Sequence, residues 1–337
     1  MKAYQITAPT GLNALKMIDL PEPKPGPGEI LVRIHSCSLN YRDLSMPRGG
    51  YARNDKTPLI PLSDGAGEVV EVGEGVSEFG VGDRVAGCFF QDWECGDVTE
   101  QQMYSALGGA LDGVLAEYVV FKERGAVHVP AHLDYDQAAC LPCAALTAWQ
   151  ALTLPGLEAG QTILMLGTGG VSVLALQLAK AFGARVIITS SRDDKLERAK
   201  QLGADEVINY TQTPKWHQRV RELTDGIGVD NVIEVGGAGT LEKSLKAVRV
   251  SGTVSLIGVL TGQPEQNPSP MPVLFNRIRM QGIYVGSRTM FKAMNRAISV
   301  NRIEPVIDRK FGFDEVRGAY EYLRSGNHFG KLVVRVQ

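Results

Sequence analysis

Strand-like and helix-like segments alternate without interruption through the middle of this 337-residue chain, and this alternation constrains the fold more than any other feature. Short apolar runs are followed by segments whose apolar residues recur every three to four positions, as Leu174 and Leu178 do. The predicted order is strand 162–166, helix 171–182, strand 185–189, helix 193–202, strand 206–208, helix 215–224, strand 229–235, helix 240–249 and strand 253–257. Such an order is typical of an α/β fold with a doubly wound parallel sheet.

A glycine-rich turn opens this alternating region. Gly167 allows a sharp turn after the first strand, Gly169 lets backbone amides approach a bound group, and the following helix directs its unpaired N–H groups toward that group. The natural ligand of such a turn is a diphosphate, so we predict a Rossmann domain that binds a dinucleotide. The third glycine of the GxGxxG pattern is replaced by Ser172, which makes this single motif weak evidence.

The residue that ends the second strand of a Rossmann domain meets the adenosine ribose of the dinucleotide. A carboxylate there suits the 2′-hydroxyl of NADH, whereas small polar residues with a nearby cation suit the 2′-phosphate of NADPH. Ser190 takes this position here and is followed by Ser191, Arg192 and Lys195, which together offer two hydroxyls and two cations. We therefore expect NADPH in preference to NADH; a solvated, charged helix start is the alternative interpretation.

The first 125 residues contain short alternating segments separated by glycine turns, such as 30–34 and 67–73, which is typical of a compact, barrel-like β domain. A last alternating segment at 331–336 is able to pair with that domain across the length of the chain. The predicted division is residues 1–127 with 300–337 for the β domain and residues 128–299 for the Rossmann domain.

Four further segments complete the expected elements. The spacing of apolar residues predicts one helix over 136–154, with Pro142 as the main objection. Residues 89–111 show no clear pattern, so we expect a long surface loop there. A strand is expected over 280–285, and helices are expected near 289–300 and 314–324.

Charge and composition exclude several classes of function. The 35 basic and 37 acidic residues give a net charge of −2 and are mixed along the chain, which argues against nucleic acid or an acidic membrane as the main partner. The N-terminus does not read as a signal peptide and no apolar run is long enough to span a bilayer, so we expect a cytoplasmic protein. The five cysteines are expected to be free thiols.

The chain resembles the medium-chain dehydrogenase/reductase superfamily over nearly its whole length, most closely the zinc-independent quinone oxidoreductase-like (zeta-crystallin-like) branch and its enoyl reductase relatives. The segments that carry the resemblance occur in the same order, at residues 38–43, 65–73, 82–85, 146–149, 167–172 and 330–334. The resemblance implies a GroES-like catalytic domain interrupted by the Rossmann domain, and an active site in the cleft between the two. It also implies a homodimer and hydride transfer with NAD(P)H.

The resemblance also identifies where this chain departs from the zinc-dependent members. Their first zinc cysteine corresponds to Asn40, their His-Glu pair corresponds to Ser63 and Asp64, and Cys143 lies where a third ligand is held. Catalytic zinc needs three ligands of Cys, His or carboxylate type, and asparagine and serine are poor replacements, so we expect no zinc. Cys143 also forms a CxxC motif with Cys140, whose helical context favours buried thiols over a redox pair.

Without a metal, the negative charge that develops on a substrate oxygen needs a hydrogen-bond donor or a proton. Asn40 offers amide donors, and Tyr41 or Tyr51 offers a phenol that stays protonated at neutral pH; pocket wall or core is the alternative for each tyrosine. Helix packing is the alternative for Thr147, and an exposed turn is the alternative for Tyr210. The residues expected to contact the cofactor are Thr147, Gly167, Thr168, Gly169, Gly170, Val171, Ser190, Ser191, Arg192, Lys195, Tyr210, Gly236, Ile257, Gly258, Val259 and Lys331.

Three functions fit these observations. The first is an NADPH-dependent, zinc-free reductase of quinones or α,β-unsaturated carbonyls. The second is an NAD(P)-dependent alcohol dehydrogenase or aldehyde/ketone reductase, which would produce NADPH from an alcohol and NADP⁺. The third is a protein that binds the dinucleotide without turnover, such as a redox sensor.

Overall fold

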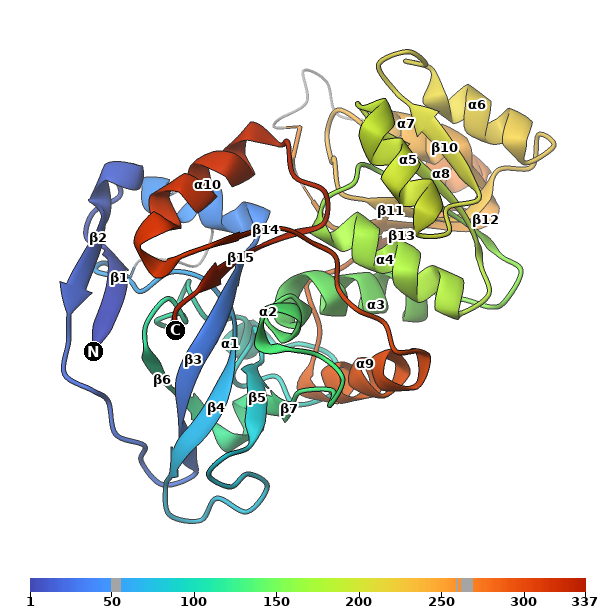
Figure 1. Ribbon diagram of the computed structural model, residues 1–337. Helices are drawn as coiled ribbons and strands as arrows, with labels where there is room; N and C mark the ends of the chain where they lie inside the picture. The colour runs from blue at the N-terminus through green and yellow to red at the C-terminus, as the bar shows by residue number, and fades with distance from the viewer. Residues whose placement is uncertain (50–55, 259, 262–268) are drawn as a thin grey trace. The chain divides into compact units, whose positions relative to one another are not determined.

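The computed structural model describes residues 1–49, 56–258, 260–261 and 269–337. These residues form two compact units, Met1–Leu146 with Val285–Gln337 and Thr147–Tyr284 (Figure 1). The first unit also holds residues 128–146 and 285–299, which the sequence analysis assigns to the Rossmann domain. They belong to the first unit because Arg288 Nε donates to the carbonyl of Ala126 (2.8 Å) and His132 Nε2 contacts the carbonyl of Ile303 (3.1 Å).

The second unit is built on a six-stranded parallel sheet. Its strands are β8(Thr162–Met165), β9(Arg185–Ser190), β10(Glu206–Asn209), β11(Val229–Glu234), β12(Val248–Leu256) and β13(Arg279–Gly282). They lie in the order β10-β9-β8-β11-β12-β13, which places the first strand next to the fourth and reverses the direction of winding between them. This arrangement confirms the predicted doubly wound sheet, because it is the strand order of a Rossmann domain.

Helix α3 precedes the first strand of this sheet, and helices alternate with the strands after it as the pattern predicts. They are α3(Leu146–Thr153), α4(Gly170–Ala181), α5(Asp193–Gln201), α6(Trp216–Leu223), α7(Leu241–Ala247) and α8(Met271–Phe275). One core cluster joins strand residues such as Leu164 and Val232 to Trp216 and Val220 of α6, all nearly or fully buried. Because both faces of a parallel sheet are covered, its strands read as continuous apolar runs.

The first unit contains a mostly antiparallel sheet. Its strands are β3(Glu29–Leu39), β4(Asp64–Val72), β5(Arg84–Gly87), β6(Tyr118–Lys122), β7(Ala126–His128), β14(Ile307–Phe311) and β15(Lys331–Arg335), and β1(Lys2–Ile6) pairs separately with β2(Leu15–Asp19). The C-terminal strand β15 is antiparallel to β3, with Leu332 opposite Leu39 (Figure 1). The last alternating segment of the sequence therefore does pair with the N-terminal β-rich region.

Short helices and turns complete the first unit. They are α1(Glu100–Met103), α2(Tyr135–Ala138), α9(Arg288–Asn301) and α10(Val316–Ser325), with the 3₁₀ turns η1(Leu12–Ala14), η2(Tyr41–Leu44), η3(Met46–Arg48), η4(Glu123–Gly125) and η6(Phe313–Glu315). The single helix expected over 136–154 is wrong: a π-helical turn, η5(Leu141–Ala145), separates α2 from α3. Pro142 lies in this turn, where its missing N–H would have interrupted a regular helix.

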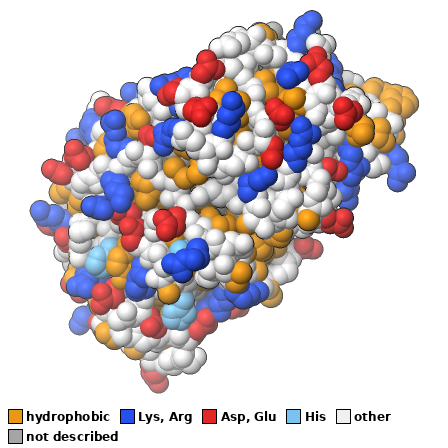
Figure 2. Space-filling model, turned by 45° about the vertical axis from the view of Figure 1, so that its right-hand side comes forward, with side chains coloured by type: hydrophobic (Ala, Val, Ile, Leu, Met, Phe, Trp, Pro, Cys, Tyr) orange, Lys and Arg blue, Asp and Glu red, His pale blue; other side chains and the backbone are white. Residues whose placement is uncertain are grey.

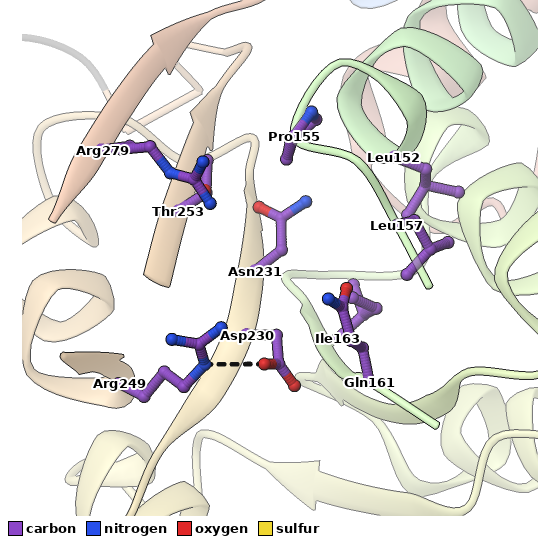
Figure 3. A pocket seen from close by; sticks show the side chains of 10 residues that line it. All are labelled: Leu152, Pro155, Leu157, Gln161, Ile163, Asp230, Asn231, Arg249, Thr253 and Arg279. Atoms are coloured by element: carbon purple, nitrogen blue, oxygen red, sulfur yellow. Dashed lines mark hydrogen bonds and ion pairs between the residues drawn. The ribbon is translucent and has the colours of Figure 1, made fainter. Parts of the chain in front are cut away.

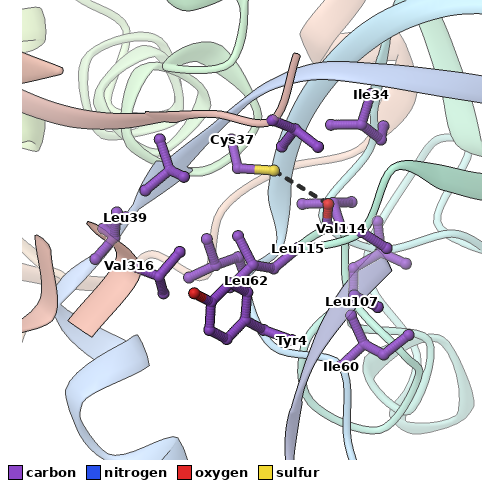
Figure 4. Packing of buried hydrophobic residues seen from close by; sticks show 14 of the residues in the cluster. Tyr4, Ile34, Cys37, Leu39, Ile60, Leu62, Leu107, Val114, Leu115 and Val316 are labelled. Atoms are coloured by element: carbon purple, nitrogen blue, oxygen red, sulfur yellow. Dashed lines mark hydrogen bonds between the residues drawn. The ribbon is translucent and has the colours of Figure 1, made fainter. Parts of the chain in front are cut away.

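The core of the first unit packs side chains from β1, β3, the loops before and after β4, and α10. Figure 4 shows Tyr4, Leu39, Leu62 and Val316 gathered in this core, with the Cys37 thiol donating to the carbonyl of Val114 (3.0 Å). At the molecular surface, basic and acidic side chains are interspersed on the face shown in Figure 2. Within the described ranges, no helix has the length and apolar character needed to cross a membrane.

Candidate dinucleotide site and a buried polar cluster

The glycine-rich turn follows the carboxyl end of β8. Gly167 has a φ of +72°, a left-handed conformation that favours glycine, and its N–H donates to Thr189 Oγ1 (3.2 Å). Helix α4 begins at Gly170, and among the described residues no side chain caps its first turn. The amide groups of that turn and the positive end of the helix dipole are therefore suited to a diphosphate, which is what a dinucleotide presents there.

Ser172 replaces the third glycine of the motif without disturbing the turn. Its side chain is almost fully buried, and its Oγ donates to the carbonyl of Leu166 at 2.7 Å. The hydroxyl is thus satisfied by the strand that precedes the turn, so a buried serine is compatible with close helix–strand packing.

The end of β9 brings the predicted adenosine-side residues together. Ser190 Oγ lies 3.2 Å from Thr168 Oγ1, and the Tyr210 N–H donates to the carbonyl of Ser190 (3.0 Å). Arg192 forms a bidentate ion pair with Asp194, with Nε–Oδ1 at 2.9 Å and Nη2–Oδ2 at 2.7 Å. Asp194 therefore offsets part of the positive charge that the sequence places at this turn.

Two further predicted segments meet at the ends of β11 and β12. The N–H groups of Ile257 and Gly258 both donate to the carbonyl of Glu234, at 2.9 and 3.2 Å. A Cβ on Gly258 would lie 2.1 Å from the carbonyl oxygen of Val235, so only glycine fits this approach. The structure thus brings Gly258 to the end of β11, while Val259, also assigned to the cofactor, lies outside the described residues.

Glu234 organises this strand end, a role that sequence reasoning missed. Its buried carboxylate accepts hydrogen bonds from the N–H groups of Gly236 (2.8 Å) and Gly237 (2.9 Å), from Thr240 Oγ1 (2.6 Å) and from Ser244 Oγ. The available signal was a carboxylate at the end of an apolar strand, directly before a glycine-rich turn.

A second polar cluster is buried in the first unit, at the end of β3. Lys331, the first residue of β15, is only 3% exposed, and its Nζ donates to Asn40 Oδ1 (2.6 Å) and to the carbonyl of Leu39 (2.7 Å). Asp43 Oδ2 accepts from the N–H of Asn40 (2.7 Å), which is the N-cap residue of η2. The sequence analysis assigned Asn40 to catalysis and Lys331 to the cofactor, and the structure joins the two directly.

Asp64 extends this cluster from the neighbouring strand β4. Its fully buried carboxylate accepts from Ser63 Oγ (2.6 Å) and from the Cys143 N–H (3.0 Å). Burial raises the pKa of Asp64, and the Lys331 ammonium opposes that shift. Burial also raises the pKa of Asp43 to about 6, against the opposing effect of Arg42. Both carboxyls therefore retain their protons to higher pH than exposed aspartates do.

Tyr41, Cys140, Cys143 and Thr147 differ in exposure. Tyr41 is 51% exposed at the start of η2, and Tyr51 lies outside the described residues. Cys140 and Cys143 are free thiols; burial raises the pKa of Cys140 to about 12 and that of Cys143 well above its ordinary value. Neither thiol is activated for redox chemistry, because the reactive form is the thiolate. Thr147, in the second unit, is 3% exposed within α3.

A small pocket in the second unit lies near the amino ends of the strands (Figure 3). Its lining includes Asn231, Thr253 and Arg279, which face one another across neighbouring strands, and Asp230 pairs there with Arg249 at 2.7 Å. Ligands of doubly wound sheets bind at the carboxyl ends of the strands, so this pocket is not the dinucleotide site.

Comparison with known proteins identifies the family. Residues 26–131 match the family model of the alcohol dehydrogenase GroES-like domain, and residues 170–299 match that of zinc-binding dehydrogenases. A zinc-type alcohol dehydrogenase-like protein of Schizosaccharomyces pombe is 42% identical, covering 97% of this chain and 96% of its own length. The chain belongs to the medium-chain dehydrogenase/reductase superfamily. As a member of that superfamily it is an NAD(P)-dependent oxidoreductase.

Other relatives show how widely this superfamily varies. A 2-methylene-furan-3-one reductase of Solanum lycopersicum is 34% identical over 99% of this chain and 79% of its own length. Among solved structures, a putative alcohol dehydrogenase from Sinorhizobium meliloti has a TM-score of 0.92 at 42% identity, covering 99% of this chain and 98% of its own. An NAD-dependent alcohol dehydrogenase has a TM-score of 0.91 at 34% identity, and a mycobacterial protein complexed with NADPH has 0.84 at 27%; both comparisons cover 100% of each chain.

The buried cluster is a poor site for the zinc that the family names imply. The positions that the resemblance relates to zinc ligands hold Asn40, the Ser63-Asp64 pair and Cys143, and the Lys331 ammonium donates to Asn40 Oδ1. In the described part of the chain, no three His, Cys, Asp or Glu side chains group as a metal site requires. An ammonium held against the asparagine oxygen repels a divalent cation, so these residues do not fit zinc.

Proposed function

We propose that this protein is an NADPH-dependent, zinc-free reductase whose substrates are quinones or α,β-unsaturated carbonyl compounds. The observation that carries the proposal is the contact between Lys331 Nζ and Asn40 Oδ1, beside Asp64. It gives the cluster a fixed ammonium and amide donors instead of a Lewis acid. Such donors suit a substrate whose carbon is already electron-poor, because less polarisation of its oxygen is needed.

The second unit supports the dinucleotide half of the proposal. The amides of the Gly167–Gly170 turn would hold the diphosphate, and the end of β12 at Ile257 and Gly258 would lie along the nicotinamide side. Ser190, Ser191, Arg192 and Lys195 favour a 2′-phosphate, since no carboxylate ends β9. The mycobacterial neighbour complexed with NADPH supports this choice, although another neighbour is NAD-dependent. NADPH supplies a hydride when it is bound.

The residues of the first unit would then stabilise the reaction at the substrate oxygen. A hydride delivered to the β-carbon of an enone would shift the C=C electron pair into a new bond to the carbonyl carbon and the C=O electron pair onto oxygen, and protonation of this enolate would give the saturated carbonyl product. The Asn40 amide would donate a hydrogen bond to that oxygen, and Tyr41, Tyr51 or water would supply the proton. The Solanum lycopersicum relative is named 2-methylene-furan-3-one reductase, and this name supports an enone as substrate.

We further propose that the protein is a homodimer. Strand β13 lies at the edge of the described sheet, and all four of its residues are exposed. Helix α8, which precedes β13 in the chain, exposes Leu274 (65%) and Phe275 (76%), a pair of large apolar side chains whose contact with water is unfavourable. A second copy of the chain would cover both features.

Kinetics with the purified protein test the proposal. NADPH oxidation should be faster with a quinone or an enone than with a simple aldehyde of similar size, NADPH should bind more tightly than NADH in a fluorescence titration, and elemental analysis should show no stoichiometric zinc. The opposite substrate ranking, or NADPH formation from a simple alcohol and NADP⁺ as the fastest reaction, would favour an alcohol dehydrogenase. NADH that binds as tightly as NADPH would contradict the proposed cofactor preference. About one zinc per chain would contradict the proposal that the enzyme works without zinc.

A further inference from the structure

Lys331 is an unusual residue to find at the start of β15, because a lysine is seldom buried without a partner. It is 3% exposed, and its neighbour Leu332 lies opposite Leu39, so the ammonium projects to the end of β3. There Nζ donates to the carbonyl of Leu39 and to Asn40 Oδ1, which lies 291 positions away in the sequence. The sequence analysis assigned this residue to the cofactor.

The contact with Lys331 decides how the Asn40 amide is oriented. An ammonium has only donors, so the amide atom that faces it at 2.6 Å has to be the oxygen, Oδ1. The nitrogen Nδ2 therefore points away from Lys331. The orientation of an asparagine amide is often ambiguous between oxygen and nitrogen, but here the chemistry of its neighbour settles it.

Nδ2 of Asn40 is left as a buried donor. Within the described residues it has no partner that meets strict hydrogen-bond geometry; the nearest acceptor is the carboxyl of Asp64, whose pKa a side-chain hydrogen bond from Asn40 helps to lower. Asp64 itself already accepts from Ser63 Oγ and the Cys143 N–H. Buried donors without acceptors are rare in folded proteins and call for an explanation, such as a ligand oxygen that accepts from them.

We propose that Lys331 is a positioning residue: its ammonium fixes Asn40 so that Nδ2 donates to the carbonyl oxygen of the substrate. This inference rests on the proposed function only in requiring that a carbonyl oxygen be the acceptor. Two contacts of main-chain groups reinforce the arrangement. The Asn40 N–H donates to Asp43 Oδ2 at 2.7 Å, and Lys331 Nζ donates to the Leu39 carbonyl. Lys331 thus acts on the reaction through Asn40.

A double-mutant cycle measures this dependence. The variants Lys331→Met, Asn40→Ala and the double variant are assayed at saturating NADPH with whichever carbonyl substrate the wild type reduces fastest. Loss of one donor to a developing oxyanion lowers kcat by about 10²-fold, and we expect each single variant to approach that loss. The double variant should be no slower than Asn40→Ala, because Lys331 has nothing to position once the amide is gone.

Two further variants separate positioning from stability. Asn40→Asp keeps an oxygen for Lys331 but removes the donor, so it should fold, bind NADPH as the wild type does, and lose about 10²-fold in kcat. Lys331→Arg retains a cation and should recover part of the kcat that Lys331→Met loses. Lys310→Met is the matched control, since Lys310 lies on the neighbouring strand β14 and pairs with Asp136 instead. It should retain the wild-type kcat.

Three results would overturn the inference. Losses in kcat that multiply in the double variant would show that Lys331 acts independently of Asn40. Weaker NADPH binding in Lys331→Met, with kcat preserved at saturating NADPH, would show the direct cofactor contact that the sequence analysis expected. Full activity of Asn40→Asp would show that Nδ2 is not a donor. If the wild type prefers aldehydes, the proposed function is contradicted. The double-mutant cycle is then measured with the aldehyde as substrate, so the inference is tested separately.

Discussion

Asp136 and Asp43 are both buried aspartates of the first unit, yet their neighbours shift their pKa values in opposite directions. Burial alone would raise the pKa of Asp136, but hydrogen bonds from Arg335, Lys310 and Ser36 lower it to about 2. Asp43 receives one backbone hydrogen bond, and its pKa rises to about 6. The charged donors Arg335 and Lys310 outweigh the effect of burial at Asp136, whereas burial is the larger effect at Asp43.

Asp136→Asn should destabilise the protein at neutral pH. A pKa lowered from 3.8 to about 2 corresponds to stability that is present above pH 4 and is lost as the pH falls toward 2. Because Arg335 and Lys310 are half exposed, we expect only about 1–2 kcal/mol, or a Tm lower by roughly 3–6 °C. Urea midpoints at pH 7, 5, 4 and 3 measure the difference, which should shrink below pH 4.

An exposed aspartate is the control for this measurement. Asp97→Asn, in the loop before α1, should leave the urea midpoint unchanged at every pH. A deficit in Asp136→Asn that stays constant from pH 7 to pH 3 would mean that the charge of Asp136 contributes nothing.

Elements with a strong local pattern could be predicted from the sequence, and those decided by tertiary contacts could not. The parallel strands and helices α4 to α7 match the alternating apolar pattern within a few residues, because both faces of their sheet are buried. The π-helical turn at 141–145 escaped prediction because its five residues share the spacing of the helix around it. Strand β14 was missed because Arg309 and Lys310 make it read as exposed loop, whereas its backbone pairs with β15.

The end of β12 gives a test at this scale. Gly258→Ala would place a methyl group 2.1 Å from the carbonyl oxygen of Val235, and because that neighbour is backbone, the strand end has to shift. We expect a destabilisation of about 1–3 kcal/mol and weaker NADPH binding, measured by thermal unfolding and fluorescence titration. Gly318→Ala is the control, because a Cβ there meets nothing within 4 Å and α10 should tolerate or favour it. Unchanged NADPH affinity in Gly258→Ala would argue against a cofactor contact at this strand end.

At the scale of the whole molecule, the family could be predicted from the order of motifs, and the comparisons confirm it. The pairing of β15 with β3 brings Lys331 to Asn40 across nearly the whole chain, and no local pattern reports such a contact. The sequence therefore identified both residues but not their hydrogen bond, which depends on strand register and on the burial of both side chains. The role of Glu234 differs in kind, because all its hydrogen-bond partners lie within ten residues of it in the sequence.

The homodimer is the prediction that concerns the molecule as a whole. Light scattering after size exclusion should give the mass of two chains for the wild type, and Phe275→Asp should shift the protein to one chain. The reason is that a charge on α8 would be desolvated in an interface that covers Leu274 and Phe275, whereas in the monomer it would face water.

Val300→Asp is the matched control: Val300 is 82% exposed, equally apolar, and lies on α9 of the other unit, so its replacement should leave the dimer intact. A wild type that elutes as one chain would show that there is no dimer. A Phe275→Asp variant that still dimerises, while Val300→Asp does not, would show that the interface lies elsewhere. Because the edge of β13 would continue the parallel sheet of one copy into that of the next, loss of the dimer should also lower the Tm of the second unit.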